Sequence, residues 1–303
     1  MDFGHHSMPE MVEFALPPWN QQDLLELRPE PQFETQVFIG STTWNQAAWV
    51  GNTYPPKTPK SAYHNAYGAS FDTLELNSTH YNIPAESVIR KWCEKVPESF
   101  RYCPKAPQFI SHRNDLGFQS GYLDLYLEML SKFGQKLGLP FIQFPPYFKA
   151  DRMDSLIEWV KYVHKKQKHA LEFRHESWFE NQDNKLVLLL KKFNWPLVIT
   201  DTSGRRDLIH MRLTSTDFIV RFVACGIVEL DEKRLDDWVE RLFPLIIRQQ
   251  LNNIYFFMHD PDHYLLPDMA FYLKNAFQNK DIKVRKVLKN LPDSDLQQQL
   301  KLF

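Results

Sequence analysis

The chain has 303 residues, with 36 Lys and Arg side chains against 37 Asp and Glu, and a formal net charge of -1. This balance argues against a protein that binds nucleic acid mainly through phosphate charge, because such proteins carry a clear basic excess. Only 10 glycines occur, which leaves little room for glycine-rich phosphate-binding loops or flexible linkers.

The cysteines and the apolar runs indicate in which cellular compartment we expect the protein. Cys93, Cys103 and Cys225 are odd in number and form no CxxC pair, so we expect neither a disulfide framework nor a cysteine zinc site. No apolar run approaches the roughly 18 residues that span a bilayer. The first residues also lack the basic and then apolar pattern of a secretory signal. We therefore expect a cytoplasmic protein without a membrane partner.

Residues 1–36 differ from the rest of the chain. They hold seven acidic residues against one base, Arg28, and their prolines include those at positions 17, 18, 29 and 31. Proline fixes the backbone in extended and turn conformations, so this composition predicts an extended acidic arm rather than a core element.

From residue 37 to residue 290, short apolar runs alternate with longer stretches of helical period. The runs predict strands at 37–41, 72–78, 100–106, 139–144, 169–174, 196–201, 217–222 and 253–259. The stretches between them predict helices at 61–70, 85–96, 121–137, 152–166, 183–193, 231–250 and 266–279. Only 203–216 is too short for more than a small helix.

This alternation predicts an α/β fold with a parallel sheet. Eight strands with helical crossovers over about 250 residues are the count of a single TIM (β/α)8 barrel. We therefore expect a barrel domain at 37–290, an acidic N-terminal extension at 1–36 and a C-terminal tail at 291–303. A doubly wound open sheet is the alternative, but its first turn usually carries several glycines, and VFIGSTTWN has one.

Polar side chains recur near the carboxyl ends of the predicted strands. Residues two apart in a strand share a face, so Glu75 lies with Asn77, and Glu172 lies with Arg174. Barrel strands are otherwise apolar on both faces, and their carboxyl ends converge on the face where active sites lie. We therefore expect a shared polar site from Glu75, Asn77, Lys105, Gln143, Glu172, Arg174, Asp201, Arg221 and His259.

The chemistry of this set is mixed. Carboxylates such as Glu75, Glu172 and Asp201 act as acids, bases or metal ligands. Cations such as Lys105 and Arg221 suit phosphate or carboxylate groups. A purely structural ion pair between Glu172 and its neighbour Arg174 is the alternative. His112, His175 and His259 can hold a metal or move protons.

Three rings follow strand ends and are candidates to line a binding pocket by stacking: Trp44, Tyr81 and Trp178. Packing beneath a loop is the alternative for each of them. The chain contains none of the motifs GxGxxG, GxxxxGK[ST], HExxH or GxSxG, nor an EF-hand loop. The basic stretch at 280–290 is more typical of a solvated tail than of a nucleic-acid contact.

Several segments resemble a known family. They are FIGSTTWNQAAWVGNTYPP, the segment running from FDTLELNSTHYN to YCPKAPQFISH, LGLPFIQFPPYF and ALEFRHESWF. In order over about 37–260, they are similar to the YecE-like family, domain of unknown function 72. The resemblance implies a TIM barrel, an uncharacterised function and no established cofactor. The matching motif residues are Trp44, Trp49, Tyr54, Glu75, Asn77, Tyr81, Lys105, His112, Gln143, Pro145, Pro146, Glu172, Arg174, Trp178, Asp201 and Arg221.

Two positions depart from the family pattern. The family usually has His-Gly after the arginine of the seventh strand, where this chain reads RFVACG. It also tends to have Asn at the end of the eighth strand, where this chain has Met258, His259 and Asp260.

Three functional hypotheses follow. The first is an enzyme for a small anionic substrate, with Glu172 or Glu75 as acid or base and Lys105, Arg174 and Arg221 holding the anion. The second is a metal-dependent phosphoesterase or nuclease-like barrel, with a divalent ion as cofactor. Its ligands would be Glu75, Glu172, Asp201, His175 and His259. The third is a non-catalytic module that binds nucleic acid or a partner by stacking.

Overall fold

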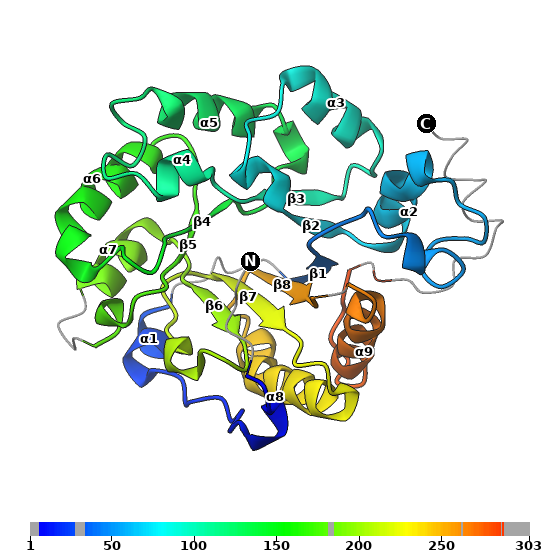
Figure 1. The fold of residues 1–303 in the computed structure, drawn as a ribbon. Coiled ribbons are helices and arrows are strands. Elements are labelled where there is room, and N and C mark those ends of the chain that lie inside the picture. Colours follow the sequence, from blue (N-terminus) through cyan, green and yellow to red (C-terminus); the bar gives the residue numbers. More distant parts are fainter. Residues whose placement is uncertain (1–5, 28–33, 181–184, 262, 286, 288–303) are drawn as a thin grey trace.

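The computed structural model describes residues 6–27, 34–180, 185–261, 263–285 and 287 (Figure 1). All eight predicted strands are present, several of them shorter than expected. They are β1 (Gln36–Ser41), β2 (Thr73–Leu76), β3 (Arg101–Pro104), β4 (Phe141–Gln143), β5 (Ala170–Glu172), β6 (Val198–Asp201), β7 (Asp217–Val223) and β8 (Asn253–His259).

The strands pair in parallel. Six of them form one sheet in the order β3-β2-β1-β8-β7-β6, and β4 and β5 form a second sheet. Isolated bridges connect the two sheets on both sides, through Lys105 and Phe141 next to β3 and β4, and through Leu171 and Leu197 next to β5 and β6. The fold is therefore α/β, with a parallel central sheet.

Helices lie around the strands (Figure 1). Their bounds are α1 (Gln21–Glu26), α2 (Tyr63–Ser70), α3 (Glu86–Glu94), α4 (Gln108–Ser111), α5 (Tyr122–Ser131), α6 (Met153–Val163), α7 (Lys185–Phe193), α8 (Val228–Ile247) and α9 (Leu266–Gln278). Between β6 and β7 there is only a short 3-10 turn, Arg206–Leu208, as the sequence predicts. Within the described ranges, no helix combines the length and the apolar character needed to cross a bilayer.

Strand alternation produces two separate apolar clusters. One joins the outward strand faces to the helices. The other is smaller and is formed by Phe38, Cys103, Leu139, Phe141, Ala170, Val198, Ile219, Tyr255 and Phe257. Because residues two apart share a strand face, the side chains that follow this inner cluster toward the carboxyl ends lie directly next to it. The polar strand-end residues therefore form the next layer above the inner cluster.

The prediction that residues 1–36 are an arm outside the core is wrong for the described part of this segment. Phe14, Leu16 and Trp19 are buried, and the last two belong to the main apolar cluster. The indole Nε1 of Trp19 donates to the carbonyl oxygen of Arg241 on α8 at 3.2 Å, and its ring meets Phe218 of β7 at 5.7 Å. Residues 28–33 and the predicted tail at 291–303 lie outside the described residues.

Asp23 on α1 is fully buried and fixes this segment to the rest of the fold. Its carboxylate accepts hydrogen bonds from Arg212 at 2.6 and 3.0 Å and from the amide of Leu213 at 3.1 Å. The ammonium group of Lys191 on α7 lies 2.7 Å away. Removal of the carboxylate takes this acceptor away from four N–H donor groups on three residues.

Asp23→Ala is therefore expected to lower the free energy of unfolding by about 1–3 kcal/mol, measured by urea denaturation near pH 7. The matched control is Glu26→Gln, one turn further along α1, where the carboxylate also contacts Lys191 but is far more exposed. Equal midpoints for the two variants would contradict the role assigned to Asp23.

Candidate functional site

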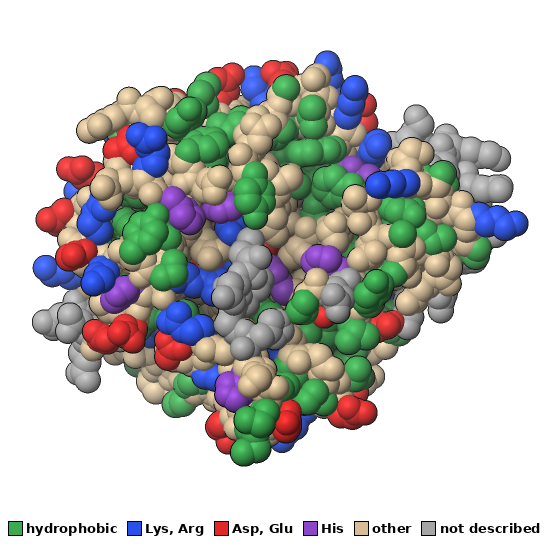
Figure 2. All heavy atoms as spheres, viewed as in Figure 1, with side chains coloured by type: hydrophobic (Ala, Val, Ile, Leu, Met, Phe, Trp, Pro, Cys, Tyr) green, Lys and Arg blue, Asp and Glu red, His purple; other side chains and the backbone are tan. Residues whose placement is uncertain are grey.

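The inward-facing side chains at the carboxyl ends of the strands form one polar layer above the inner apolar cluster. Figure 2 shows several histidine side chains around the middle of the face viewed there. The members of the polar layer are Glu75 (β2), Lys105 (after β3), Gln143 (β4), Glu172 (β5), Thr200 (β6), Arg221 (β7) and His259 (β8). Except for the partly buried Gln143, all of them are buried.

Arg221 joins the two carboxylates of the layer. Its Nε and Nη2 donate to the two oxygens of Glu75, both at 2.9 Å, and its Nη1 donates to Oε2 of Glu172 at 2.7 Å. The guanidinium lies 5.3 Å from the ring centroid of Phe141 in the inner cluster. Bidentate pairing of this kind fixes both the position and the charge of the carboxylates.

Glu75 has further partners. Asn77 donates to Oε1 at 2.9 Å, and the Nε2–H of His259 donates to Oε2 at 3.0 Å. Burial alone would raise the pKa of Glu75, but the charge of Arg221 and then the contact with His259 hold that pKa well below its usual range. Burial in turn lowers the pKa of His259, despite the neighbouring carboxylate. Glu75 is therefore a fixed anion at neutral pH.

Glu172 is held in the same way. Thr200 donates to its Oε1 at 2.8 Å, and Nη2 of Arg174 lies 2.6 Å from the same oxygen. Burial would raise the pKa of Glu172, but Arg174 and Arg221 lower it below its usual range. The sequence-based alternative of a structural pair between Glu172 and Arg174 describes one part of this larger network.

Lys105 donates to a neutral amide. Its side chain is 1% exposed, and Nζ donates to Oε1 of Gln143 at 2.7 Å. Burial, together with the charge of Arg221, lowers the pKa of Lys105 to about 7, although Glu172 and Glu75 act in the opposite direction. At neutral pH the amine therefore exists in both protonation states.

Two histidines border Lys105. The Nδ1–H of His80 donates to the carbonyl oxygen of Ala106 at 2.8 Å, and the rings of His80 and His112 lie 5.6 Å apart. Burial and the charge of Lys105 lower the pKa of His80 to about 4, and they lower the pKa of His112 as well. Both imidazoles are therefore neutral near pH 7. The sequence predicts His112 here but misses His80.

The expectation that Asp201 shares this site is wrong. In the parallel register Thr200 pairs with Arg221, whereas Asp201 pairs with Phe222 on the opposite face. Asp201 consequently points outward, where Arg234 donates to it at 2.9 Å and the Nε1–H of Trp238 donates at 2.8 Å, both from α8. It belongs to a separate buried cluster.

That outer cluster also holds the N-terminal segment. Arg206 donates to Asp201 and, at 2.8 Å, to the carbonyl oxygen of Phe14. The guanidinium of Arg234 lies 4.3 Å from the ring centroids of both Phe14 and Phe222. The cluster therefore stabilises the packing of the segment against β6 and α8.

Two of the three predicted stacking rings pack away from the polar layer. Trp44 stacks on His64 with ring centroids 4.0 Å apart, and His64 in turn bonds to the hydroxyl of Tyr102 on the outward face of β3. Trp178 is buried against Phe173 at 4.4 Å, and its Nε1 donates to the carbonyl oxygen of Phe148 at 2.7 Å. Tyr81, by contrast, is 63% exposed beside His80.

The metal hypothesis finds no preformed ligand set in the part of the chain that the structure describes, where no group of three or more His, Cys, Asp or Glu side chains is placed to hold an ion. His175 instead accepts a hydrogen bond from the amide of Ser177 at 3.1 Å. The oxygens of Glu75 and Glu172 already accept from arginine, and Asp201 faces outward.

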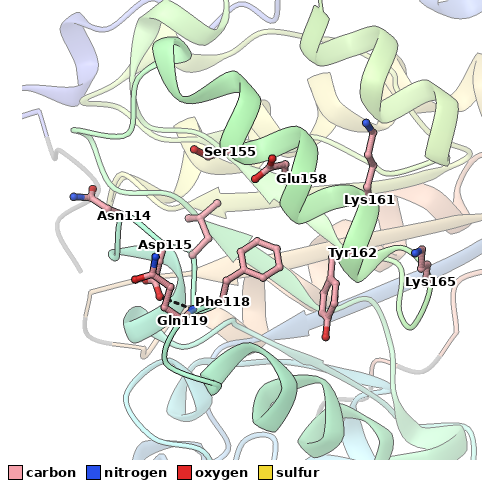
Figure 3. Close-up of a pocket in the computed structure, with 10 residues that line it drawn as sticks. Asn114, Asp115, Phe118, Gln119, Ser155, Glu158, Lys161, Tyr162 and Lys165 are labelled. Carbon is pink, nitrogen blue, oxygen red and sulfur yellow. Dashed lines mark hydrogen bonds between the residues drawn. The ribbon is translucent and has the colours of Figure 1, made fainter.

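A surface cavity of about 590 Å³ lies away from the polar layer, between residues 114–119 and α6 (Figure 3). Ser155, Glu158, Lys161 and Tyr162 of α6 line one side, and the ring of Phe118 contacts that of Tyr162 at 5.3 Å. No member of the polar layer is among its lining residues, so this cavity is not the site that the sequence predicts.

Comparisons with known proteins identify the family. A sequence similar over 259 residues is the UPF0759 protein YecE of Escherichia coli (strain K12), 23% identical, with 78% of this chain and 91% of that protein covered. The UPF0759 protein YunF of Bacillus subtilis (strain 168) is 31% identical over 150 residues, 47% of this chain and 52% of that protein.

Solved structures support the same assignment at the level of the fold. A DUF72 family protein from Enterococcus faecalis V583 superposes with a TM-score of 0.61 at 17% identity, covering 82% of this chain and 99% of that one. A DUF72 family protein from Thermotoga maritima MSB8 gives 0.57 at 20% identity, covering 80% and 99%. The family profile described as "Protein of unknown function DUF72" matches residues 38–295, and the chain belongs to this family.

Proposed function

We propose that the chain is an enzyme that acts on a small substrate bearing a phosphate or carboxylate group, and that it binds this substrate at the polar layer. The observation that carries the proposal is Lys105, a buried amine at a strand end, where the charges of Arg221 and Arg174 act on it and its pKa is about 7. A group whose pKa lies near the working pH is the most efficient proton donor and acceptor.

The carboxylates support this role without exchanging protons themselves. Arg221 keeps Glu75 ionised, and Arg174 and Arg221 keep Glu172 ionised, so both carboxylates are weak bases at neutral pH and cannot serve as acids. We therefore assign the acid/base step to Lys105 rather than to Glu172 or Glu75. The carboxylates and Arg221 form a fixed electrostatic frame that is set before the substrate arrives.

Arg174, which contacts this frame through Glu172, is the cation best suited to bind the anionic group of the substrate. It is 6% exposed at the end of the chain of contacts that runs from Glu75 through Arg221 and Glu172. Arg205 donates from the β6–β7 connection to the carbonyl oxygen of Arg174 at 3.3 Å, which braces this residue from outside. The charge of Arg174 also acts on Lys105, so a substrate anion bound at Lys105 would be attracted by both cations.

The closure of the strands into a barrel is a second part of the proposal. We infer that the two hydrogen-bonded sheets close into a TIM barrel over residues 37–290, because bridges join β3 to β4 and β5 to β6. In such barrels the carboxyl ends of the strands carry the active site, which is where the polar layer lies.

The test is a turnover screen of small phosphate and carboxylate esters, acids and phosphorylated sugars with the purified protein, with and without added Mg²⁺, Mn²⁺ or Zn²⁺. Lys105→Met is expected to lower turnover by about 10²- to 10⁴-fold, the usual contribution of a positioned acid or base. The control is Lys91→Met, an exposed lysine on α3.

Turnover that survives in Lys105→Met at the wild-type rate would remove Lys105 from the mechanism. Activity that appears only with added metal, and equally in both variants, would favour the metal-dependent hypothesis instead.

A further inference from the structure

Four rings form a continuous row at the carboxyl ends of β2, β3 and β4. Tyr81 meets His80 with ring centroids 5.3 Å apart, His80 meets His112 at 5.6 Å, and His112 meets Tyr147 at 6.2 Å. We call Tyr81, His80, His112 and Tyr147 the ring row. The four residues come from three different connections, so the row is a product of the fold.

The two ends of the row are open to solvent. Tyr81 is 63% exposed and Tyr147 is 61% exposed, which is a large exposure for aromatic rings beside a buried charged layer. Both are nevertheless held in place. The hydroxyl of Tyr147 donates to the carbonyl oxygen of His112 at 3.1 Å, and the amide of Tyr81 donates to the carbonyl oxygen of Ser78 at 3.2 Å.

The middle of the row borders the cations of the polar layer. The positive charge of Lys105 contributes to lowering the pKa of both His80 and His112, and the charge of Arg221 contributes at His80 as well. The backbone gives the same placement, because His80 is anchored on the carbonyl oxygen of Ala106, the residue after Lys105. Neutral rings therefore lie next to buried positive charge.

We propose that the ring row is the subsite for a planar unsaturated ring of the substrate, whose anionic group reaches Lys105 and Arg174. The substrate class is then an aryl or heteroaryl phosphate or carboxylate. Exposed, prepositioned aromatic rings stack on planar ligands with little loss of side-chain freedom, and the adjacent cations select the anionic member of that class. This inference rests on the proposed function and narrows it.

The experiment compares ligands that differ only in the planarity of the ring. Phenyl phosphate and cyclohexyl phosphate form one pair, and benzoate and cyclohexanecarboxylate form the other, so that the two pairs also distinguish phosphate from carboxylate. Inorganic phosphate and acetate measure how tightly the anionic group binds without a ring. Binding is measured by isothermal calorimetry, or by saturation-transfer NMR for the weakest ligands.

In at least one pair the aryl ligand is expected to bind at least about five-fold more tightly than its saturated partner, the lower end of what one stacked ring contributes. Tyr81→Ala and Tyr147→Ala are expected to reduce this preference, and Tyr147→Phe is expected to keep most of it. Tyr122→Ala, at a partly exposed tyrosine on α5 outside the row, is the control.

Equal affinity within both pairs would overturn the ring subsite and leave the proposed anion site standing, provided that the anions bind. A preference that persists in the double variant Tyr81→Ala/Tyr147→Ala would overturn it as well. Failure of all six ligands, inorganic phosphate and acetate included, would count against the proposed function itself.

Discussion

Arg221→Met is expected to lower the free energy of unfolding by about 3–5 kcal/mol near pH 7.5, because it leaves Glu75 buried without its arginine and leaves Glu172 with Arg174 as its remaining arginine partner. Glu75 and Glu172 both lose their contact with the guanidinium, and the first is 0% exposed and the second 1% exposed. Urea denaturation measures the loss. Arg221→Lys, which keeps the charge but not the bidentate geometry, is expected to lose less.

The pH dependence of this loss has a definite sign. In the wild-type protein the pKa values of Glu75 and Glu172 lie below the usual 4.5, so their contribution to stability is present above pH 4.5 and is lost as the pH falls through the folded values. Without Arg221, burial raises the pKa of Glu75, whereas Arg174 still lowers that of Glu172, and protonation of Glu75 then stabilises the variant as the pH falls. The difference in stability between the two proteins should therefore shrink from about pH 7.5 to about pH 5.

A second-site change provides an independent check. Glu75→Gln in the Arg221→Met background removes the carboxylate that has lost its arginine, and it is expected to restore part of the lost stability at about pH 7.5. A gap that widens at lower pH, or a double variant less stable than Arg221→Met, would show that the ion pairs do not dominate the energetics of the layer.

The titration of Lys105 is expected to make the wild-type protein more stable relative to Lys105→Met as the pH rises from about 7 to about 10.5. The pKa of Lys105 is about 7 in the folded chain against the usual 10.5, so the unfolded chain binds more protons across this range, and stability increases with pH. At about 1.4 kcal/mol for each pKa unit, the change is on the order of a few kcal/mol.

Urea denaturation of both proteins at about pH 7, 8.5 and 10 measures this change, with Lys91→Met as the reference for an exposed lysine. Once a substrate is known, the rate of a step in which Lys105 accepts a proton should rise through about pH 7. Parallel stability curves for the wild-type protein and Lys105→Met would show that the amine is charged in the folded state.

The regular period of strands explains why much of the candidate site can be predicted from the sequence. Once the short apolar runs are read as strands, Glu75, Lys105, Glu172 and Arg221 fall at their carboxyl ends, and parallel strands bring those ends together. The alternation of faces alone does not show which of two adjacent polar residues at the end of a strand points inward. Asp201 and Thr200 are adjacent polar residues, and only the register with β7 shows that Thr200 points inward.

The direction of side chains outside helices and strands is harder to predict, because the sequence there has no regular period. Trp44 and Trp178 follow strands as expected but turn toward the outer apolar cluster. His80 lies in a short 3-10 turn, Asn77–His80, whose sequence does not indicate which way the imidazole points. Asp23 looks like one acid among seven, since its partners Lys191 and Arg212 are far away in the sequence.

The residues that pack together in this fold extend beyond the segment that matches the family. The family match begins at residue 38, yet Trp19 and Asp23 occupy buried positions of the same apolar and ionic clusters. A chain cut at the family boundary would expose the outer surface of Arg234 and leave Arg212 without its carboxylate. In this chain, residues that precede the segment matched by the family profile contribute buried contacts to the matched domain.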